Sequence, residues 1–306
     1  MSAQFIIEQL MHGVGYGLML FLMAAGLTLV FGIMDTLNLS HGSLFMVGAY
    51  ISSTVHQYMH SFVLAVAVAV IGTMLLAAVL ERILFRRLYA ADHLVQVVAT
   101  VGVIFVADSL VMMIWGEAPL MASTPHALSG PLYLTEDWPY PSYRFVVLAA
   151  GLGVAGLLYV LVNHTRLGML VRAGASNRQM AELMGLRVKR VFMVVFVLGA
   201  ALAGLAGSLM APISAVQVGM GEGIMIPAFA VIVIGGIGSM RGALIAALLV
   251  GVVEALGKIL GPPTLKLWLS PAVVADVLPS LTSMLMFLLM IGVLMFKPRG
   301  LFPARG

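Results

Sequence analysis

The sequence predicts an all-α, polytopic membrane protein of about eight to ten transmembrane helices, some of them short or broken. Of its 306 residues, 62% are hydrophobic and only 9% are charged, whereas soluble domains average about 25% charged residues. In lipid, every backbone polar group must be satisfied internally, which favours helices. Apolar segments recur from end to end, so we expect one transmembrane domain covering residues 1–306.

Nine segments are apolar enough to cross a bilayer, which takes roughly 20 residues of helix. They are 11–32, 42–59, 62–82, 95–115, 145–163, 191–212, 224–239, 242–260 and 273–296. The segments at 42–59 and 224–239 are short, and the second carries Pro227 and ends near Gly235. Short or interrupted helices often line a transport pathway; a tilted or interfacial helix is the alternative.

The basic residues predict the orientation, because Lys and Arg concentrate in cytoplasmic loops. Alternate loops hold 13 of the 16: Arg82, Arg86, Arg87, Arg166, Arg172, Arg178, Arg187, Lys189, Arg190, Arg241, Lys297, Arg299 and Arg305. The other loops hold only Arg144, Lys258 and Lys266. Nine spans then place the N-terminus outside and the C-terminus in the cytoplasm, with Glu117, Glu136 and Asp137 in a long outer loop.

A polar segment at about 164–190 is the largest feature on the predicted cytoplasmic side. Ser176 or Asn177 can cap a short helix, and Gly185 is placed to end it. Met180, Leu183 and Met184 recur at helical spacing and form one apolar face. Such a helix either docks on a partner protein or lies on the lipid headgroups.

A second polar segment joins the first two predicted spans. Asn38 or Ser40 can cap the next helix, and Gly42 and Gly48 permit close backbone approach. A helix N-terminus at membrane depth suits a carboxylate. His41 is either a proton carrier or, more commonly, a hydrogen-bonding histidine near the interface.

Small residues recur at spacing four, as in Gly13 and Gly17 or Gly199, Ala203 and Gly207. In lipid such rows allow helices to pack closely within one subunit, or less often between subunits. Asp108 and Glu254 stand inside spans and should face a cavity or a partner. For Glu254, Lys258 four residues on is the simplest partner.

We do not expect this chain to catalyse a reaction itself. Cysteine is absent, which excludes disulfides and thiol catalysis. We find no set of nucleophile, base and oxyanion donors, so no catalytic residue, metal site or cofactor is predicted.

Four ordered motifs carry a family resemblance over essentially the whole chain. Residues 38–50 (NLSHGSLFMVGAY), 166–185, 235–242 (GGIGSMRG) and 297–302 (KPRGLF) resemble the branched-chain amino acid ABC transporter permeases, specifically the H-type subunit of leucine/isoleucine/valine importers. Lys297 stands where Arg is more usual. Relatives import urea, short amides or aromatic acids, so the resemblance leaves the solute open.

The resemblance implies a non-enzymatic importer subunit in the bacterial inner membrane. Its partners would be a second homologous permease, two cytoplasmic ABC ATPases and an extracytoplasmic substrate-binding protein. The translocation path would include Asn38, Ser40, His41 and Gly42, and ATPase coupling would involve Arg172, Ala173, Asn177, Ala181, Glu182 and Gly185. Coupling loops of other ABC importers begin Glu-Ala-Ala, but this chain has Arg172-Ala173-Gly174, so individual contacts do not transfer. The alternative is a secondary transporter driven by an ion gradient.

Overall fold

A computed structural model describes residues 3–34, 38–89, 91–125, 128–135, 138–176, 178–265 and 270–302. Nine helices overlap the nine predicted segments, although α1 begins eight residues earlier and α10 begins and ends four residues earlier than predicted. They are α1 (Ala3–Met34), α2 (His41–Met59), α3 (Phe62–Leu80), α5 (His93–Trp115), α6 (Ser142–His164), α9 (Val188–Met210), α10 (Met220–Gly235), α11 (Met240–Leu265) and α12 (Pro271–Phe296). Shorter helices are α4 (Arg86–Leu88), α7 (Arg166–Ser176) and α8 (Arg178–Leu183).

Seven helical stretches of the described chain are long and apolar enough to span a membrane. They are Gln4–Gly32, Phe62–Leu88, His93–Trp115, Ser142–His164, Val188–Met210, Met240–Leu265 and Ala272–Phe296. The polytopic helical fold is therefore confirmed. The two segments predicted to be short, α2 and α10, are not among the seven, and α10 has only 16 residues.

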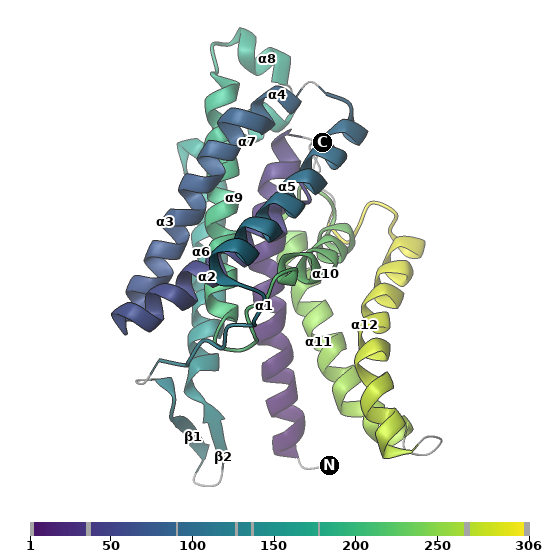
Figure 1. Ribbon diagram of the computed structural model, residues 1–306. Helices are drawn as coiled ribbons and strands as arrows, with labels where there is room; N and C mark the ends of the chain where they lie inside the picture. The colour runs from purple at the N-terminus through teal and green to yellow at the C-terminus, as the bar shows by residue number, and fades with distance from the viewer. Residues whose placement is uncertain are drawn as a thin grey trace.

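Helix α1 is the centre of the molecule. It runs along the middle of the bundle, with α11 and α12 on one side and α3, α6 and α9 on the other (Figure 1). Its residues from Leu18 to Ala25 are each at most 2% exposed, and it packs against α6, α9, α10 and α11. A helix that is apolar on all sides is stable only when surrounded in this way.

Glycines and alanines set the close helix contacts. A Cβ added to Gly17 would lie 2.6 Å from the Ala247 carbonyl oxygen of α11, and one added to Gly48 would lie 2.6 Å from Gly204 Cα of α9. Backbones this close gain dispersion energy that lipid cannot supply. These glycines and alanines therefore allow helices to pack closely within the subunit, which is the first of the two alternatives that the sequence left open.

The C-terminal motif packs on the glycine-rich motif that follows α10. Leu301 and Phe302 donate backbone hydrogen bonds to the Ile234 and Gly235 carbonyl oxygens, at 2.8 and 3.0 Å. Gly236 and Gly300 both have positive φ, and a Cβ on Gly300 would lie 2.5 Å from Gly236 Cα. Two of the four sequence motifs are thus one structural unit.

The helix from Phe62 continues beyond its predicted end at residue 82, through the π-helical turn η1 (Glu81–Phe85) to Leu88. Arg82, Arg86 and Arg87 suggested a loop. The Glu81 carboxylate, fully buried, instead accepts hydrogen bonds from Tyr89 Oη at 2.8 Å and Arg86 Nη2 at 3.4 Å. The Glu81 carboxylate thus offsets part of the positive charge of Arg86 within the continuing helix.

Substituting Glu81 with alanine should destabilise the bundle by about 1–3 kcal/mol, because Arg86 and Tyr89 lose a buried acceptor. The measurement is the thermal unfolding midpoint of the purified protein in detergent. The matched control is Glu117→Ala, which removes an exposed loop carboxylate. Equal midpoints for the two variants would show that the Glu81 contacts contribute little.

The loop between α5 and α6 contains an antiparallel hairpin that was not predicted, formed by β1 (Pro131–Thr135) and β2 (Trp138–Pro141). Pro131 pairs with Pro141 and Leu132 with Tyr140. The hairpin lies beside the α6 start, at the opposite end of the molecule from α4 and α8 (Figure 1). Tyr140 of β2 is fully buried.

Candidate functional site

The first turns of the two short helices, α2 and α10, meet inside the bundle. Gly42 and Gly221 contact each other reciprocally: a Cβ on either residue would collide with the carbonyl oxygen of the other. Gly219, which precedes α10, has a positive φ of 82°. Several of the first N–H groups already donate to the preceding turn, such as Met220 to the Gln217 carbonyl and Glu222 to the Gly219 carbonyl. The junction therefore brings together the positive dipole ends of two helices.

The predicted path residues Asn38, Ser40 and His41 are all buried at the start of α2, each at most 1% exposed, and Gly42 is buried beside them. Ser40 occupies the N-cap position, but its side chain does not cap the helix. The capping prediction is therefore wrong. Ser40 Oγ donates to Asn38 Oδ1 at 2.6 Å, which fixes the turn, and the Ser40 carbonyl accepts from the Ser43 N–H at 3.0 Å.

Two buried polar atoms at the start of α2, and one on α1, lack a hydrogen-bond partner in the part of the chain that the structure describes. Asn38 Nδ2 and His41 Nε2 have no hydrogen-bond partner among the described residues, and neither does Thr28 Oγ1 of α1. His41 Nε2 faces α1, 2.8 Å from where a Gly26 Cβ would be. Unsatisfied buried groups are costly and call for an explanation. A polar solute crossing this region could bind them in passing.

The predicted coupling segment forms α7 and α8 and ends as expected at Gly185. Gly185 has a φ of 85°, its N–H donates to the Glu182 carbonyl at 3.0 Å, and the Leu186 N–H donates to the Ala181 carbonyl at 2.9 Å. Such left-handed glycines satisfy the last carbonyl groups of a helix. The predicted helix at 176–184 is preceded by α7, which the sequence did not separate.

The coupling candidates divide between surface and interior. Arg172, Ala173, Glu182 and Gly185 are exposed, Ala181 is buried, and Asn177 lies outside the described residues. The apolar face of α8 is uncovered: Leu183 and Met184 are each 83% exposed. Helix α7 is fixed to α6 by Gly168, which packs on the Val162 carbonyl, and by Arg172, which donates to the same oxygen.

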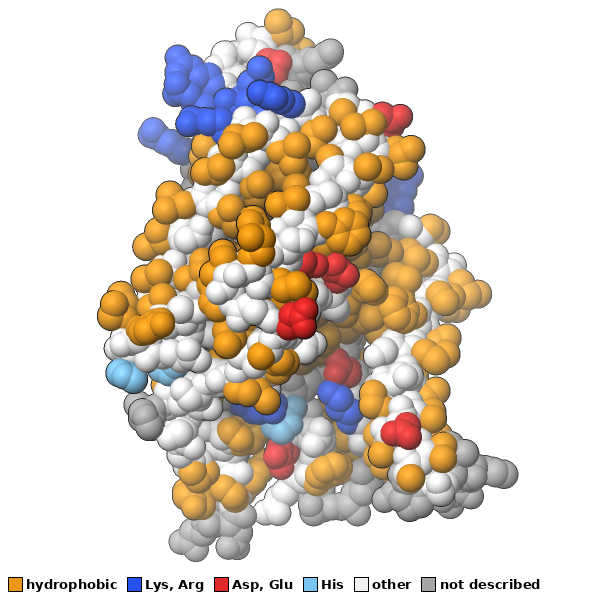
Figure 2. Space-filling model, in the orientation of Figure 1, with side chains coloured by type: hydrophobic (Ala, Val, Ile, Leu, Met, Phe, Trp, Pro, Cys, Tyr) orange, Lys and Arg blue, Asp and Glu red, His pale blue; other side chains and the backbone are white. Residues whose placement is uncertain are grey.

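A basic groove lies at the end of the bundle that carries α4 and α8, and the start of α9 also lines it. It has a volume of about 750 Å³, and its basic lining residues are Arg82, Arg86, Arg187, Lys189 and Arg190. Lys and Arg side chains gather at this end of the molecule (Figure 2). The charge asymmetry seen along the sequence is therefore also an asymmetry in space.

The ionisable residues inside spans have nearby partners. Lys258 Nζ donates to Glu254 Oε1 at 2.6 Å, which confirms the predicted intrahelical pair. Asp108 of α5 lies beside Glu222 in the first turn of α10, so the two acids face each other.

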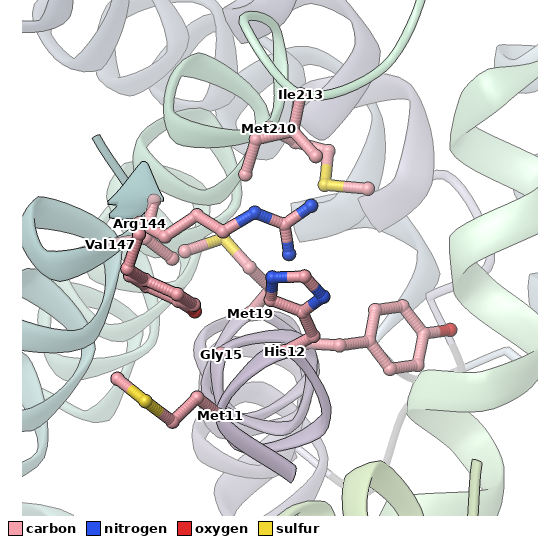
Figure 3. A pocket seen from close by; sticks show the side chains of 10 residues that line it. Met11, His12, Gly15, Met19, Arg144, Val147, Met210 and Ile213 are labelled. Atoms are coloured by element: carbon pink, nitrogen blue, oxygen red, sulfur yellow. The ribbon is translucent and has the colours of Figure 1, made fainter. Parts of the chain in front are cut away.

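A small cavity between α1, α6 and the hairpin was not foreseen. This hairpin pocket, of about 60 Å³, is lined by His12, Tyr140 and Arg144 among methionines (Figure 3). Arg144 was the one sequence feature that pointed to this pocket, because the predicted outer loops contain few basic residues. Its neighbours come from distant parts of the chain, and sequence spacing does not reveal them.

A family model and curated relatives, each covering most of the chain, agree with one another. The family model "Branched-chain amino acid transport system / permease component" matches residues 9–294. The chain is 28% identical to the high-affinity branched-chain amino acid transport system permease protein LivH of Salmonella typhimurium, over 84% of this chain and 88% of that protein. It is 28% identical to BraD of Pseudomonas aeruginosa (82% and 86%) and 27% identical to a probable LivH of Methanocaldococcus jannaschii (79% and 78%).

No solved structure matches the chain. The relatives are named as transport components and not as enzymes. With seven apolar helices of spanning length, this chain is a multi-pass protein of the bacterial inner membrane. The match over nearly its whole length shows that it belongs to the family of branched-chain amino acid transport permeases.

Proposed function

We propose that this chain is the transmembrane permease subunit of an ATP-binding-cassette importer that carries branched-chain or related amino acids into the cytoplasm by alternating access. The observation that carries the proposal is the junction of α2 and α10 inside the bundle, in a chain of this family. Transporters commonly build their solute sites from short or broken helices whose N-terminal ends favour anionic groups.

The path would pass Asn38, Ser40, His41 and Gly42. Asn38 Nδ2 and His41 Nε2 are buried without partners in the described structure, so a passing solute gains hydrogen bonds there. An amino-acid carboxylate would be favoured by the two helix ends at Gly42 and Gly221. Rearrangement of α2 against α10 would open the path to one side at a time.

The end of the molecule that carries the basic groove would face the cytoplasm. This follows from the excess of Lys and Arg in cytoplasmic loops. It places the N-terminus outside, the C-terminus inside, and α7 and α8 on the side where ATP is available.

Two ABC ATPases would bind at α7 and α8, and a second homologous permease would complete the membrane core. The exposed Leu183 and Met184 offer an apolar surface for an ATPase groove. Arg172, Ala173, Asn177, Glu182 and Gly185 would act with them, and the buried Ala181 would hold α8 on the bundle. An extracytoplasmic binding protein would deliver solute to the opposite face. The chain itself would hold no cofactor.

The test is co-purification followed by transport. When co-expressed with its candidate partners and extracted in mild detergent, the chain should carry an ABC ATPase in fixed proportion. Proteoliposomes of that complex, with the binding protein added outside, should take up leucine, isoleucine or valine only when ATP is enclosed in the lumen, which corresponds to the cytoplasm. A solitary chain that takes up solute along an ion gradient, without ATP, would instead establish the secondary-transporter alternative. Parallel assays with urea, short amides and phenylalanine would identify a different solute class.

A further inference from the structure

The hairpin pocket has a permanently charged side chain in its wall. Arg144, in the first turn of α6, lines the cavity, and no carboxylate of the described chain lies within ion-pair distance of it. Its guanidinium group extends across the cavity toward His12 of α1 (Figure 3). A guanidinium offers a fork of N–H donors that matches a carboxylate.

A second donor lies beside it. Tyr140 is fully buried, and its hydroxyl lies within hydrogen-bonding reach of the Arg144 guanidinium, from which it can accept while keeping its own proton to donate. Its ring packs on the His12 ring, with centroids 5.5 Å apart. Burial raises the pKa of Tyr140, although the nearby Arg144 acts in the opposite direction, so the hydroxyl keeps its proton and can donate it.

An acid, Glu8, lies next to His12, one of the residues that line the pocket. Glu8 is one helical turn before His12, and its Oε1 lies 3.8 Å from His12 Nε2. This nitrogen is buried without a hydrogen-bond partner in the part of the chain that the structure describes. A cation in the wall of the cavity and an acid next to His12 suit a zwitterion better than a simple anion.

The remaining walls are apolar and adaptable. Met11, Met19 and Met210 line the cavity with Val147. Methionine side chains adjust to irregular apolar shapes. At about 10–15 Å³ per enclosed water, this cavity has room for roughly four to six waters, which occupy about 120–180 Å³ in the liquid, so its ligand is no larger than a small amino acid.

We propose that the hairpin pocket is a second solute site, which binds a zwitterionic amino acid with an apolar side chain before it reaches the α2–α10 junction. Arg144 and Tyr140 hold the carboxylate, Glu8 accepts the ammonium group, and the methionines contact the side chain. The site lies at the end of the bundle away from the basic groove, where solute would enter. The solute class, and the direction of entry, rest on the proposed function.

The experiment measures equilibrium binding of radiolabelled leucine to the assembled complex in nanodiscs, without ATP or binding protein. Arg144→Met should weaken binding about 10- to 100-fold, the usual effect of losing a charge-assisted hydrogen bond. Tyr140→Phe should weaken it about 2- to 10-fold. Leucinol, which has a hydroxyl in place of the carboxylate, should compete poorly against the wild type. Arg241→Met removes an exposed cation at the other end and should leave binding unchanged.

A second variant blocks the cavity without removing a polar group. Gly15 lines the pocket, with only Leu148 Cδ2 within 4 Å of an added Cβ, at 3.9 Å. Gly15→Leu should therefore abolish binding, whereas Gly153→Leu, on an open face of α6, should not. Wild-type leucine affinity in Arg144→Met or Gly15→Leu, or no binding by the wild type, would overturn the pocket assignment. Uptake by the wild-type complex decides the proposed function separately, because it is measured on a protein in which both sites are intact.

Discussion

Replacing Gly42 with valine is expected to reduce uptake to less than about a tenth of wild type. The first side-chain carbon would collide with the Gly221 carbonyl oxygen and with Met225 Cγ, 2.6 Å away. Backbone atoms on both helices have no rotamer by which to move aside, so α2 and α10 must separate. If the two helices form the solute path, separating them removes its geometry. Uptake of labelled leucine into proteoliposomes is the measurement.

The control for this change is Gly223→Val. Gly223 lies two residues beyond Gly221 on the same helix, and nothing lies within 4 Å of a Cβ added there. This variant should transport normally, although it also adds a β-branched residue to α10. The complex should be checked by size-exclusion chromatography, because Gly42→Val can also prevent assembly. A Gly42→Val complex that assembles and transports at the wild-type rate would show that the close contact is unnecessary.

The helices themselves could be predicted because the constraint that defines them is local. A spanning helix needs a run of apolar residues, and such runs are visible in one row of letters. The same holds for the end of α8, where one glycine followed a periodic apolar face. The shortness of α2 and α10 was also visible as the length of their apolar runs.

Contacts between distant segments could not be predicted. Ser40 was expected to cap α2, because serine before a helix commonly does so; here Asn38 offers its hydroxyl a better-placed acceptor. The end of α3 was misplaced because three arginines suggested a loop, and the buried Glu81 that neutralises one of them is recognised only when Tyr89 and Arg86 are seen beside it. The hairpin pocket joins residues more than 120 positions apart, such as His12 and Tyr140.

The second large effect is expected at Gly185. Its φ of 85° is strained for any residue with a side chain, and valine there costs about 1–2 kcal/mol. No atom lies within 4 Å of an added Cβ, so the strain falls on the backbone of the turn and not on packing. The end of α8 should then rearrange and displace Leu183 and Met184. If these residues couple the ATPase to the permease, Gly185→Val should keep ATP hydrolysis while uptake falls at least about fivefold.

Asparagine provides the matched control, because it tolerates the left-handed conformation far better than a β-branched residue. Gly185→Asn should therefore restore most of the coupling lost in Gly185→Val, although it adds a side chain of similar size. This pair separates a requirement for backbone conformation from one for an unobstructed surface. Equal loss in both variants would mean that the ATPase contacts Gly185 directly. Normal uptake together with normal solute-stimulated hydrolysis in Gly185→Val would remove the coupling role from α8.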